Sequence, residues 1–215
     1  MQALNVDGCL PCAPPAALAA LPKGRLLAQS QSLFARAGLD ADFSGRALYA
    51  GEAGSRLVLA RGRDIPLYLR GGAAELGIVG RDLLLEDGAG LVEVADLGFG
   101  RCRLVFAGPA GFEPARGVRV ASRYPGLAER YLAARGVAAR IVALAGAVEG
   151  AVGAGLADAV VDVVETGGTL RAHGLVELDE VAVSTARLVR SADRPLSPQA
   201  TQVARRVTAA VAVGR

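Results

Sequence analysis

The chain has 215 residues, of which 52% are hydrophobic, so it holds enough apolar material for one large or two small domains. Its 24 basic and 21 acidic side chains give a net charge of +3 without a long block of like charge, which argues against nucleic acid or a membrane surface as a partner. It has no uninterrupted apolar run of about 18 residues and no basic N-terminal region of a signal peptide, so we expect a cytoplasmic protein.

The first fifteen residues, Met1–Pro15, show no periodicity, and we expect them to form a flexible leader. Cys9 and Cys12 have the spacing of a redox motif, but no strand precedes them and prolines follow at once, so we assign them no redox or zinc role. The whole chain has one histidine, so a zinc site held by the protein is not expected. We expect a required metal to arrive as magnesium carried by phosphates.

A basic turn follows the first predicted strand. Residues 17–21 read as a buried strand, 22–25 as a turn, and 26–37 as an amphipathic helix. In open α/β sheets ligands bind at the carboxyl ends of the strands, so Lys23 and Arg25 are expected to face a crevice. Lys23 is the single lysine of an arginine-rich chain, which favours a role as a functional point charge over a chance surface position.

Strands and helices then alternate, as in parallel βαβ units. Residues 47–50 and 56–60 predict a hairpin or flap that carries Arg46 and Arg56. The next predicted elements are a helix capped by Asp64 with Pro66 in its first turn, a strand over 76–79, and a helix that starts at Gly80–Asp82.

The pattern changes after Leu91, and it indicates a second lobe. Residues 91–107 are strand-rich with no helix between, which predicts a long strand pair that crosses between lobes. Strands over 118–121, 140–144 and 159–164, helices over 124–135 and 147–154, a strand-rich return over 175–190, and a C-terminal helix from Ser197-Pro198 to about Val211 complete the chain. We therefore predict an α/β fold with a cleft between two lobes: residues 16–100 and 186–215 form lobe I, and 101–185 form lobe II.

The most informative stretch is Glu149–Leu170. Its strand, 159–164, is apolar apart from Asp162, and it stops at Thr166-Gly167-Gly168-Thr169, where hydroxyls, exposed backbone N–H groups and the start of a helix suit an anion. A carboxylate beside a phosphate serves a hydroxyl or a metal, so Asp162 and Glu165 point to a ribose phosphate. The turn lacks the lysine of a Walker loop. A plain tight turn is the alternative that these residues alone leave open.

At these spacings, Glu149, Gly155, Ala157, Val160, Asp162, Val163, Thr166, Gly167, Thr169 and Leu170 resemble the signature of the ATP phosphoribosyltransferases of histidine biosynthesis. Ala20–Leu26, Asp64–Tyr68, Gly72–Asp82, Asp96–Leu104, Ala121–Pro125 and Ser184–Leu188 extend the resemblance over most of the chain. The family has a two-lobed fold like that of type II periplasmic binding proteins, with two crossings between the lobes. Ala147 and His173 depart from the family pattern, which has serine and frequently asparagine there.

The resemblance implies the short form of the enzyme, which lacks a C-terminal regulatory domain. Chains of that form work in a hetero-octamer with a regulatory subunit similar to histidyl-tRNA synthetase. The implied reaction joins N1 of ATP to C1 of 5-phosphoribosyl diphosphate and releases diphosphate.

The resemblance also implies roles for individual residues. Catalysis is assigned to Arg25, Arg46 and Asp162, and substrate binding to Lys23, Gly24, Glu149, Asp162, Glu165, Thr166, Gly167, Gly168 and Thr169. The turn 166–169 takes the 5′-phosphate, the carboxylates take the ribose hydroxyls or magnesium, and the basic residues take diphosphate and ATP phosphates. Mg²⁺ is carried by diphosphate, with Asp162 and Glu165 as its candidate protein ligands.

Two other functions fit parts of the pattern. A binding module with the same two-lobed fold would close on a small anion without chemistry. A phosphoribosyltransferase for a different base would share the ribose-phosphate signature, because the ATP contacts are less specific than that signature.

Overall fold

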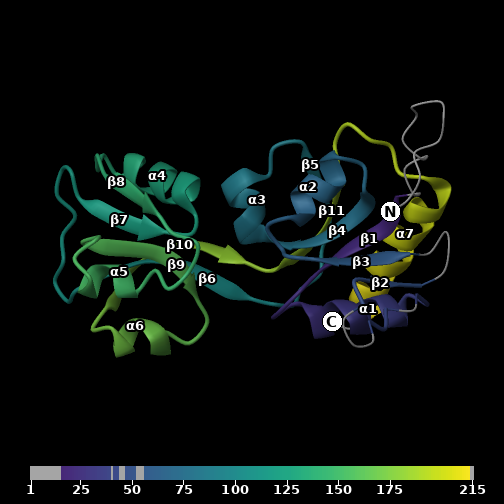
Figure 1. Ribbon diagram of the computed structural model, residues 1–215, viewed down its shortest axis with the longest axis horizontal. Coiled ribbons are helices and arrows are strands. Elements are labelled where there is room, and N and C mark those ends of the chain that lie inside the picture. Colours follow the sequence, from purple (N-terminus) through teal and green to yellow (C-terminus); the bar gives the residue numbers. More distant parts are fainter. Residues whose placement is uncertain (1–15, 40, 44–46, 52–55, 214–215) are drawn as a thin grey trace, which may run out of the picture.

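The computed structural model describes residues 16–39, 41–43, 47–51 and 56–213. The predicted leader with Cys9 and Cys12, and the predicted catalytic Arg46, lie outside the described residues. The described chain forms two β-sheets at opposite ends of an elongated molecule, each flanked by helices (Figure 1). Within these ranges no helix is long and apolar enough to cross a membrane.

The first sheet has the strand order β2-β3-β1-β4-β11-β5. Its strands are β1 (Ala17–Pro22), β2 (Tyr49–Ala50), β3 (Leu57–Ala60), β4 (Ala74–Gly80), β5 (Leu91–Asp96) and β11 (Ala186–Ser191). Helices α1 (Leu27–Arg36) and α7 (Pro198–Val213) cover one face, and α2 (Ile65–Arg70) and α3 (Arg81–Asp87) lie on the other (Figure 1). Strand β1 pairs in parallel with β3 and β4 and is buried at every residue, as expected for a strand covered on both faces.

Local signals in the sequence fix the ends of the helices in this lobe. Helix α1 ends where Gly38 adopts a φ of 74°, a left-handed conformation that glycine reaches without strain. Helix α7 begins after Ser197, whose Oγ accepts a hydrogen bond of 3.1 Å from the N–H of Ala200. The predicted cap at Ser197 is therefore confirmed. Asp64 occupies the predicted N-cap position of α2, but its side chain makes no capping bond.

The second sheet has the order β10-β6-β9-β7-β8. Its strands are β6 (Cys102–Gly108), β7 (Arg119–Ser122), β8 (Arg140–Ala143), β9 (Ala159–Val164) and β10 (Val176–Ser184). Helix α4 (Pro125–Ala133) packs on one face, and α5 (Gly150–Gly153) and α6 (Gly168–Ala172) lie on the other (Figure 1). Strand β9 runs parallel to β7 and antiparallel to β6, so its carboxyl end lies beside that of β7.

The chain crosses between the sheets twice, after β5 and at Thr185 between β10 and β11. The N–H of Ala186 donates to the carbonyl of Phe99 over 2.9 Å and joins the two crossings. The predicted two-lobed α/β fold with two crossings is confirmed. The division at residues 100/101 and 185/186 stays a prediction.

Two local predictions are wrong. Strands β5 and β6 do not pair with each other, because Gly98 and Gly100, both with positive φ, lead the chain out of the first sheet. Strand β5 pairs with β11 instead, while β6 pairs with β9 and β10. The helix expected over 147–154 is limited to α5, because Ala147 has a φ of 50° and so lies outside a right-handed helix.

Candidate active site

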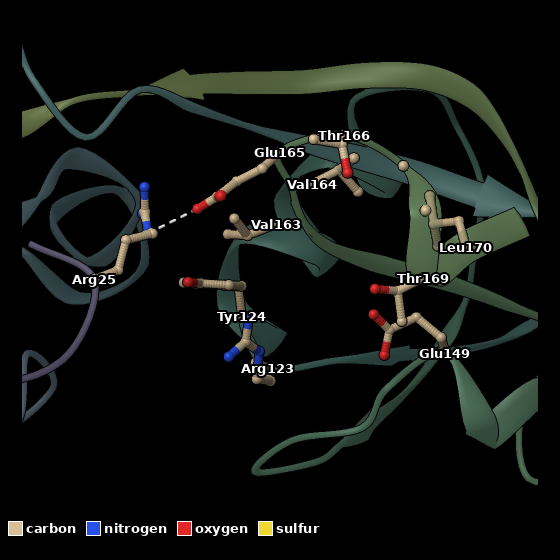
Figure 2. A pocket seen from close by; sticks show the side chains of 12 residues that line it. Arg25, Arg123, Tyr124, Glu149, Val163, Val164, Glu165, Thr166, Thr169 and Leu170 are labelled. Atoms are coloured by element: carbon tan, nitrogen blue, oxygen red, sulfur yellow. Dashed lines mark ion pairs between the residues drawn. The ribbon is translucent and has the colours of Figure 1, made fainter. Parts of the chain in front are cut away.

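A cleft of about 430 Å³ collects polar side chains from both lobes (Figure 2). It is lined by Arg25, Arg123, Tyr124, Glu149, Val163, Val164, Glu165, Thr166, Gly167, Gly168, Thr169 and Leu170. Arg25 follows the carboxyl end of β1, Arg123 and Tyr124 follow that of β7, and residues 165–170 follow that of β9. Ligands of α/β proteins bind at this edge of a sheet. The geometry of the strand ends therefore positions the cleft.

The turn after β9 contributes the largest share of the lining. Gly167 has a φ of 73°, and the residues on either side of it bring the hydroxyls of Thr166 and Thr169 to the cleft. The Nη1 of Arg171 donates to the carbonyl of Thr166 over 3.2 Å and braces the turn from outside the lining. Hydroxyls and backbone N–H groups of this kind bind phosphate oxygens without adding charge.

We expect Gly167→Ala to weaken binding of a phosphorylated ligand and to destabilise the fold by about 1–2 kcal/mol, because alanine is strained at positive φ. An added Cβ would also lie 2.9 Å from the Nη1 of Arg171. The Arg171 side chain can move away from the added Cβ, but the backbone strain at positive φ remains and shifts the turn, and the phosphate contacts shift with it. Calorimetric titration with ribose 5-phosphate and thermal unfolding measure the two consequences.

Gly174→Ala is the matched control, because Gly174 has a φ of 70° but takes no part in the cleft, and a Cβ added there would meet nothing within 4 Å. It should cost similar stability and leave ribose 5-phosphate affinity unchanged. Equal affinity losses in the two variants would show that the turn after β9 has no special part in binding.

Arg25 reaches from the first lobe to the second. Its Nε lies 3.0 Å from Oε1 of Glu165, and the two side chains are 40% and 52% exposed. Its Nη1 donates to the carbonyl of Gly100 over 2.9 Å, and its Nη2 lies 3.5 Å from Sγ of Cys102. The contacts with Gly100 and Cys102 fix the guanidinium at the mouth of the cleft, whereas the exposed ion pair with Glu165 adds little stability.

Asp162 lies behind the cleft wall. Its side chain is 6% exposed, and its Oδ1 accepts from Nε of Arg123 over 3.0 Å and from the N–H of Val163 over 2.8 Å. Burial raises the pKa of Asp162, and the positive charge of Arg123 opposes that rise. Burial alone would lower the pKa of Arg123, but the charge and hydrogen bond of Asp162 raise it.

A buried polar cluster joins the lobes beneath the cleft. The hydroxyl of Tyr124 donates to Oδ2 of Asp82 over 2.6 Å, and Oγ of Ser184 donates to Oδ1 over 2.6 Å. The N–H of Asp82 donates to Oγ of Ser184 over 2.9 Å. Burial and the neighbouring Asp82 raise the pKa of Tyr124, which keeps its hydroxyl protonated as a donor.

Most of the residues assigned to substrate from the sequence line one cleft. Those that do are Arg25, Glu149, Glu165, Thr166, Gly167, Gly168 and Thr169. Lys23 and Gly24 are exposed on the turn before Arg25 but are not among the lining residues. Asp162 reaches the cleft through Arg123.

Arg123 and Tyr124 have no site role assigned from the sequence, where they belong to the resembling stretch Ala121–Pro125, yet both line the cleft. A signal for them was present. They follow β7, which runs parallel to β9, so the rule that placed the turn after β9 at the ligand edge applies to them as well.

Carboxylates in the cleft suit a magnesium ion that is bound mainly by phosphates. Glu149 and Glu165 supply oxygen donors, which Mg²⁺ prefers. Within the part of the chain that the structure describes, no three His, Cys, Asp or Glu side chains cluster closely enough to hold a metal by themselves. The donor set therefore fits a metal that arrives with its ligand.

Comparison with known proteins matches residues 61–209 to a family model described as ATP phosphoribosyltransferase. An ATP phosphoribosyltransferase of Thermus thermophilus is 49% identical over 174 residues, with 79% of this chain and 84% of that protein covered. ATP phosphoribosyltransferase 2 of Geobacter sulfurreducens is 38% identical over 197 residues, with 86% and 93% covered.

Among solved structures, the HisG:HisZ complex of ATP phosphoribosyl transferase from Thermotoga maritima aligns with a TM-score of 0.80 at 30% identity, over 91% of this chain and 98% of the matched chain. A histidine kinase sensor domain similar to periplasmic binding proteins aligns with a TM-score of 0.58 at 12% identity, over 92% and 89% of the two chains. The similarity to the sensor domain is one of fold alone.

Proposed function

Because this chain belongs to the ATP phosphoribosyltransferase family, whose members catalyse the first step of histidine biosynthesis, we propose that its cleft binds 5-phosphoribosyl diphosphate and ATP together. The observation that carries this proposal is the turn after β9, where two threonine hydroxyls and two glycines line a cleft that also holds carboxylates and guanidinium groups. A sugar phosphate with a second, more strongly charged group matches that combination.

The 5′-phosphate binds at Thr166, Gly167, Gly168 and Thr169. The ribose hydroxyls are the natural partners of the carboxylates, and Glu149 and Glu165 both line the cleft near that turn. Arg25 faces them from the first lobe and binds phosphate oxygens of diphosphate or ATP. Lys23 and Gly24 are exposed immediately before Arg25, and their proposed contacts with phosphate form when the lobes close.

The reaction forms a bond from N1 of adenine to C1 of the ribose while the bond from C1 to the diphosphate oxygen breaks, with inversion at C1. Adenine N1 is unprotonated at neutral pH, so its lone pair attacks without help from a general base. Negative charge grows on the departing diphosphate, and positive groups aimed at that charge lower the barrier. Arg25 supplies one such group from this chain.

Magnesium, where bound, neutralises charge on the diphosphate oxygens. Glu149 and Glu165 would be its protein ligands, because their oxygens line the cleft. Asp162 is less accessible for that role, since its carboxylate accepts hydrogen bonds from Arg123 and Val163.

We further propose that the chain works in the cytoplasm with a regulatory subunit similar to histidyl-tRNA synthetase, in a hetero-octamer. The likeness to the HisG:HisZ complex from Thermotoga maritima, which extends over 98% of the matched chain, supports such a partner. Residues 16–100 with 186–215 and residues 101–185 are the two lobes that would close on the substrates.

The purified chain, mixed with ATP, 5-phosphoribosyl diphosphate and Mg²⁺, is expected to produce phosphoribosyl-ATP, followed by absorbance with and without the regulatory subunit. Inhibition by histidine only in the presence of the partner would locate the regulation. Diphosphate release with adenine or another base, but not with ATP, would indicate a different phosphoribosyltransferase. Ligand binding without turnover in either mixture would favour a binding module.

A further inference from the structure

Arg123 is a cleft residue to which the reaction above assigns no part. It follows β7 directly, its side chain is 34% exposed, and it lines the same cleft as Arg25 and the turn after β9 (Figure 2). Of the described side chains that line the cleft, Arg25 and Arg123 carry the positive charges, while Glu149 and Glu165 carry the negative ones. Full positive charge for an anionic ligand in this cleft is therefore supplied, among the described lining residues, by these two arginines.

Contacts within the protein fix one edge of the Arg123 guanidinium, and the other edge faces the cleft. Its Nε and Nη2 both lie 3.0 Å from Oδ1 of Asp162, and its guanidinium lies 5.9 Å from the ring centre of Tyr124. In the described part of the chain, Nη1 of Arg123 has no hydrogen-bond or ion-pair partner. A guanidinium fixed in this way keeps one edge available for a phosphate oxygen.

The local chemistry distinguishes the two ends of the substrate. The turn after β9 offers hydroxyls and backbone donors, which suit the 5′-phosphate because that group keeps its charge throughout the reaction. The diphosphate gains negative charge as it leaves, so it needs full positive charge nearby. Each nitrogen of Arg25 already has a partner in Glu165, Gly100 or Cys102, whereas Nη1 of Arg123 has none among the described residues, so Arg123 offers the diphosphate a second cationic contact beside Arg25.

We infer that Nη1 of Arg123 binds the diphosphate group of the phosphoribosyl donor, and that Asp162 is a positioning residue that holds Arg123 for this contact. The inference rests on the proposed function, since it assigns a residue to one part of the proposed substrate. It also explains why an acidic residue is buried within β9, next to a cleft for polyanions. Asp162 repels phosphate less when its charge is paired with Arg123.

The test compares calorimetric titrations of the full chain with magnesium diphosphate and with ribose 5-phosphate. Arg123→Gln should weaken diphosphate binding about 10- to 100-fold, which is the loss of a charge-assisted hydrogen bond, and leave ribose 5-phosphate binding within about twofold. Arg123→Lys should recover part of the diphosphate affinity, because it restores the charge without the planar fork. Unchanged diphosphate binding in Arg123→Gln, or a loss confined to ribose 5-phosphate, would overturn the assignment.

Arg119→Gln is the matched control. Arg119 is the first residue of β7 and pairs with an aspartate, Asp158, over 2.6 Å, but neither residue lines the cleft. This variant removes an arginine–aspartate pair from the opposite end of the same strand and should bind both probes as the wild type does. Thermal unfolding of both variants separates a lost contact from a lost fold.

The positioning role of Asp162 has its own readout. Asp162→Asn should weaken diphosphate binding, and the double variant Asp162→Asn/Arg123→Gln should be no weaker than Arg123→Gln alone, because Asp162 acts through Arg123. Additive losses would mean that Asp162 contacts the substrate by itself. Turnover by the wild type tests the proposed function separately: a wild type that binds diphosphate through Arg123 but forms no phosphoribosyl-ATP would refute that function and retain the diphosphate site.

Discussion

Arg25→Ala is expected to lower kcat/KM for 5-phosphoribosyl diphosphate about 10²- to 10³-fold, the size of loss that follows removal of one preorganised donor from a developing negative charge. The guanidinium stands at the mouth of the cleft and is fixed there by Gly100 and Cys102, so it needs no reorganisation to meet a phosphate. Steady-state rates of phosphoribosyl-ATP formation, with the second substrate saturating, measure the effect.

The same substitution also breaks the contact of Arg25 with Glu165, so a second variant must separate the two causes. Glu165→Gln removes the charge of the partner and keeps Arg25. If Arg25 acts on substrate by itself, the losses in Arg25→Ala and Glu165→Gln multiply in the double variant, and Arg36→Ala, on the exposed end of α1, stays within about twofold of the wild type. A double variant no worse than Arg25→Ala alone would assign the effect to the ion pair between the lobes.

The sequence predicted the parts of the site that depend on a single strand and its following turn. The run 159–164 is apolar enough to specify β9, and the glycines and threonines after it specify a turn at the edge where ligands bind. The same reasoning placed Arg25 after β1. These predictions need only local patterns and one rule about sheet edges, so they hold without knowledge of the neighbours.

The parts that the sequence did not reveal depend on contacts between distant segments. Asp162 and Arg123 are 39 residues apart, and they meet because β7 and β9 lie side by side in register. The sequence pattern predicts a helix that starts at Gly80–Asp82, but it does not show that Asp82, the second residue of α3, bonds to Ser184, 102 residues away. A composition or a spacing cannot indicate which distant side chain will satisfy a buried carboxylate.

Backbone conformation explains why α5 is shorter than predicted and why β5 and β6 do not pair with each other. The patterns of 91–107 and 147–154 fit a strand pair and a helix, but backbone conformations at Gly98, Gly100 and Ala147 override them. Periodicity describes what a segment prefers, whereas a few residues with positive φ decide where the chain turns. Such residues are difficult to locate in a chain with 28 glycines, because few of those glycines are informative by themselves.

Asp82→Ala is expected to lower the free energy of unfolding by about 2–4 kcal/mol, because it leaves the buried hydroxyls of Tyr124 and Ser184 without their acceptor. For a chain of this length the loss corresponds to about 5–12 °C in the unfolding temperature. Asp64→Ala is the matched control, since Asp64 is an exposed aspartate whose side chain makes no capping bond. Equal unfolding temperatures for the two variants would contradict the prediction.

A second substitution tests whether Asp82→Ala destabilises the chain because the buried hydroxyl of Tyr124 is left without an acceptor. In the wild type, Tyr124→Phe removes a donor from the Asp82 carboxylate and should destabilise the chain by about 1.5–3 kcal/mol. In Asp82→Ala the same change removes a hydroxyl that no longer has its acceptor, so it should cost much less or even stabilise the chain. Because Asp82 lies on α3 and Tyr124 immediately before α4, this difference would measure directly how strongly the cluster couples the two lobes.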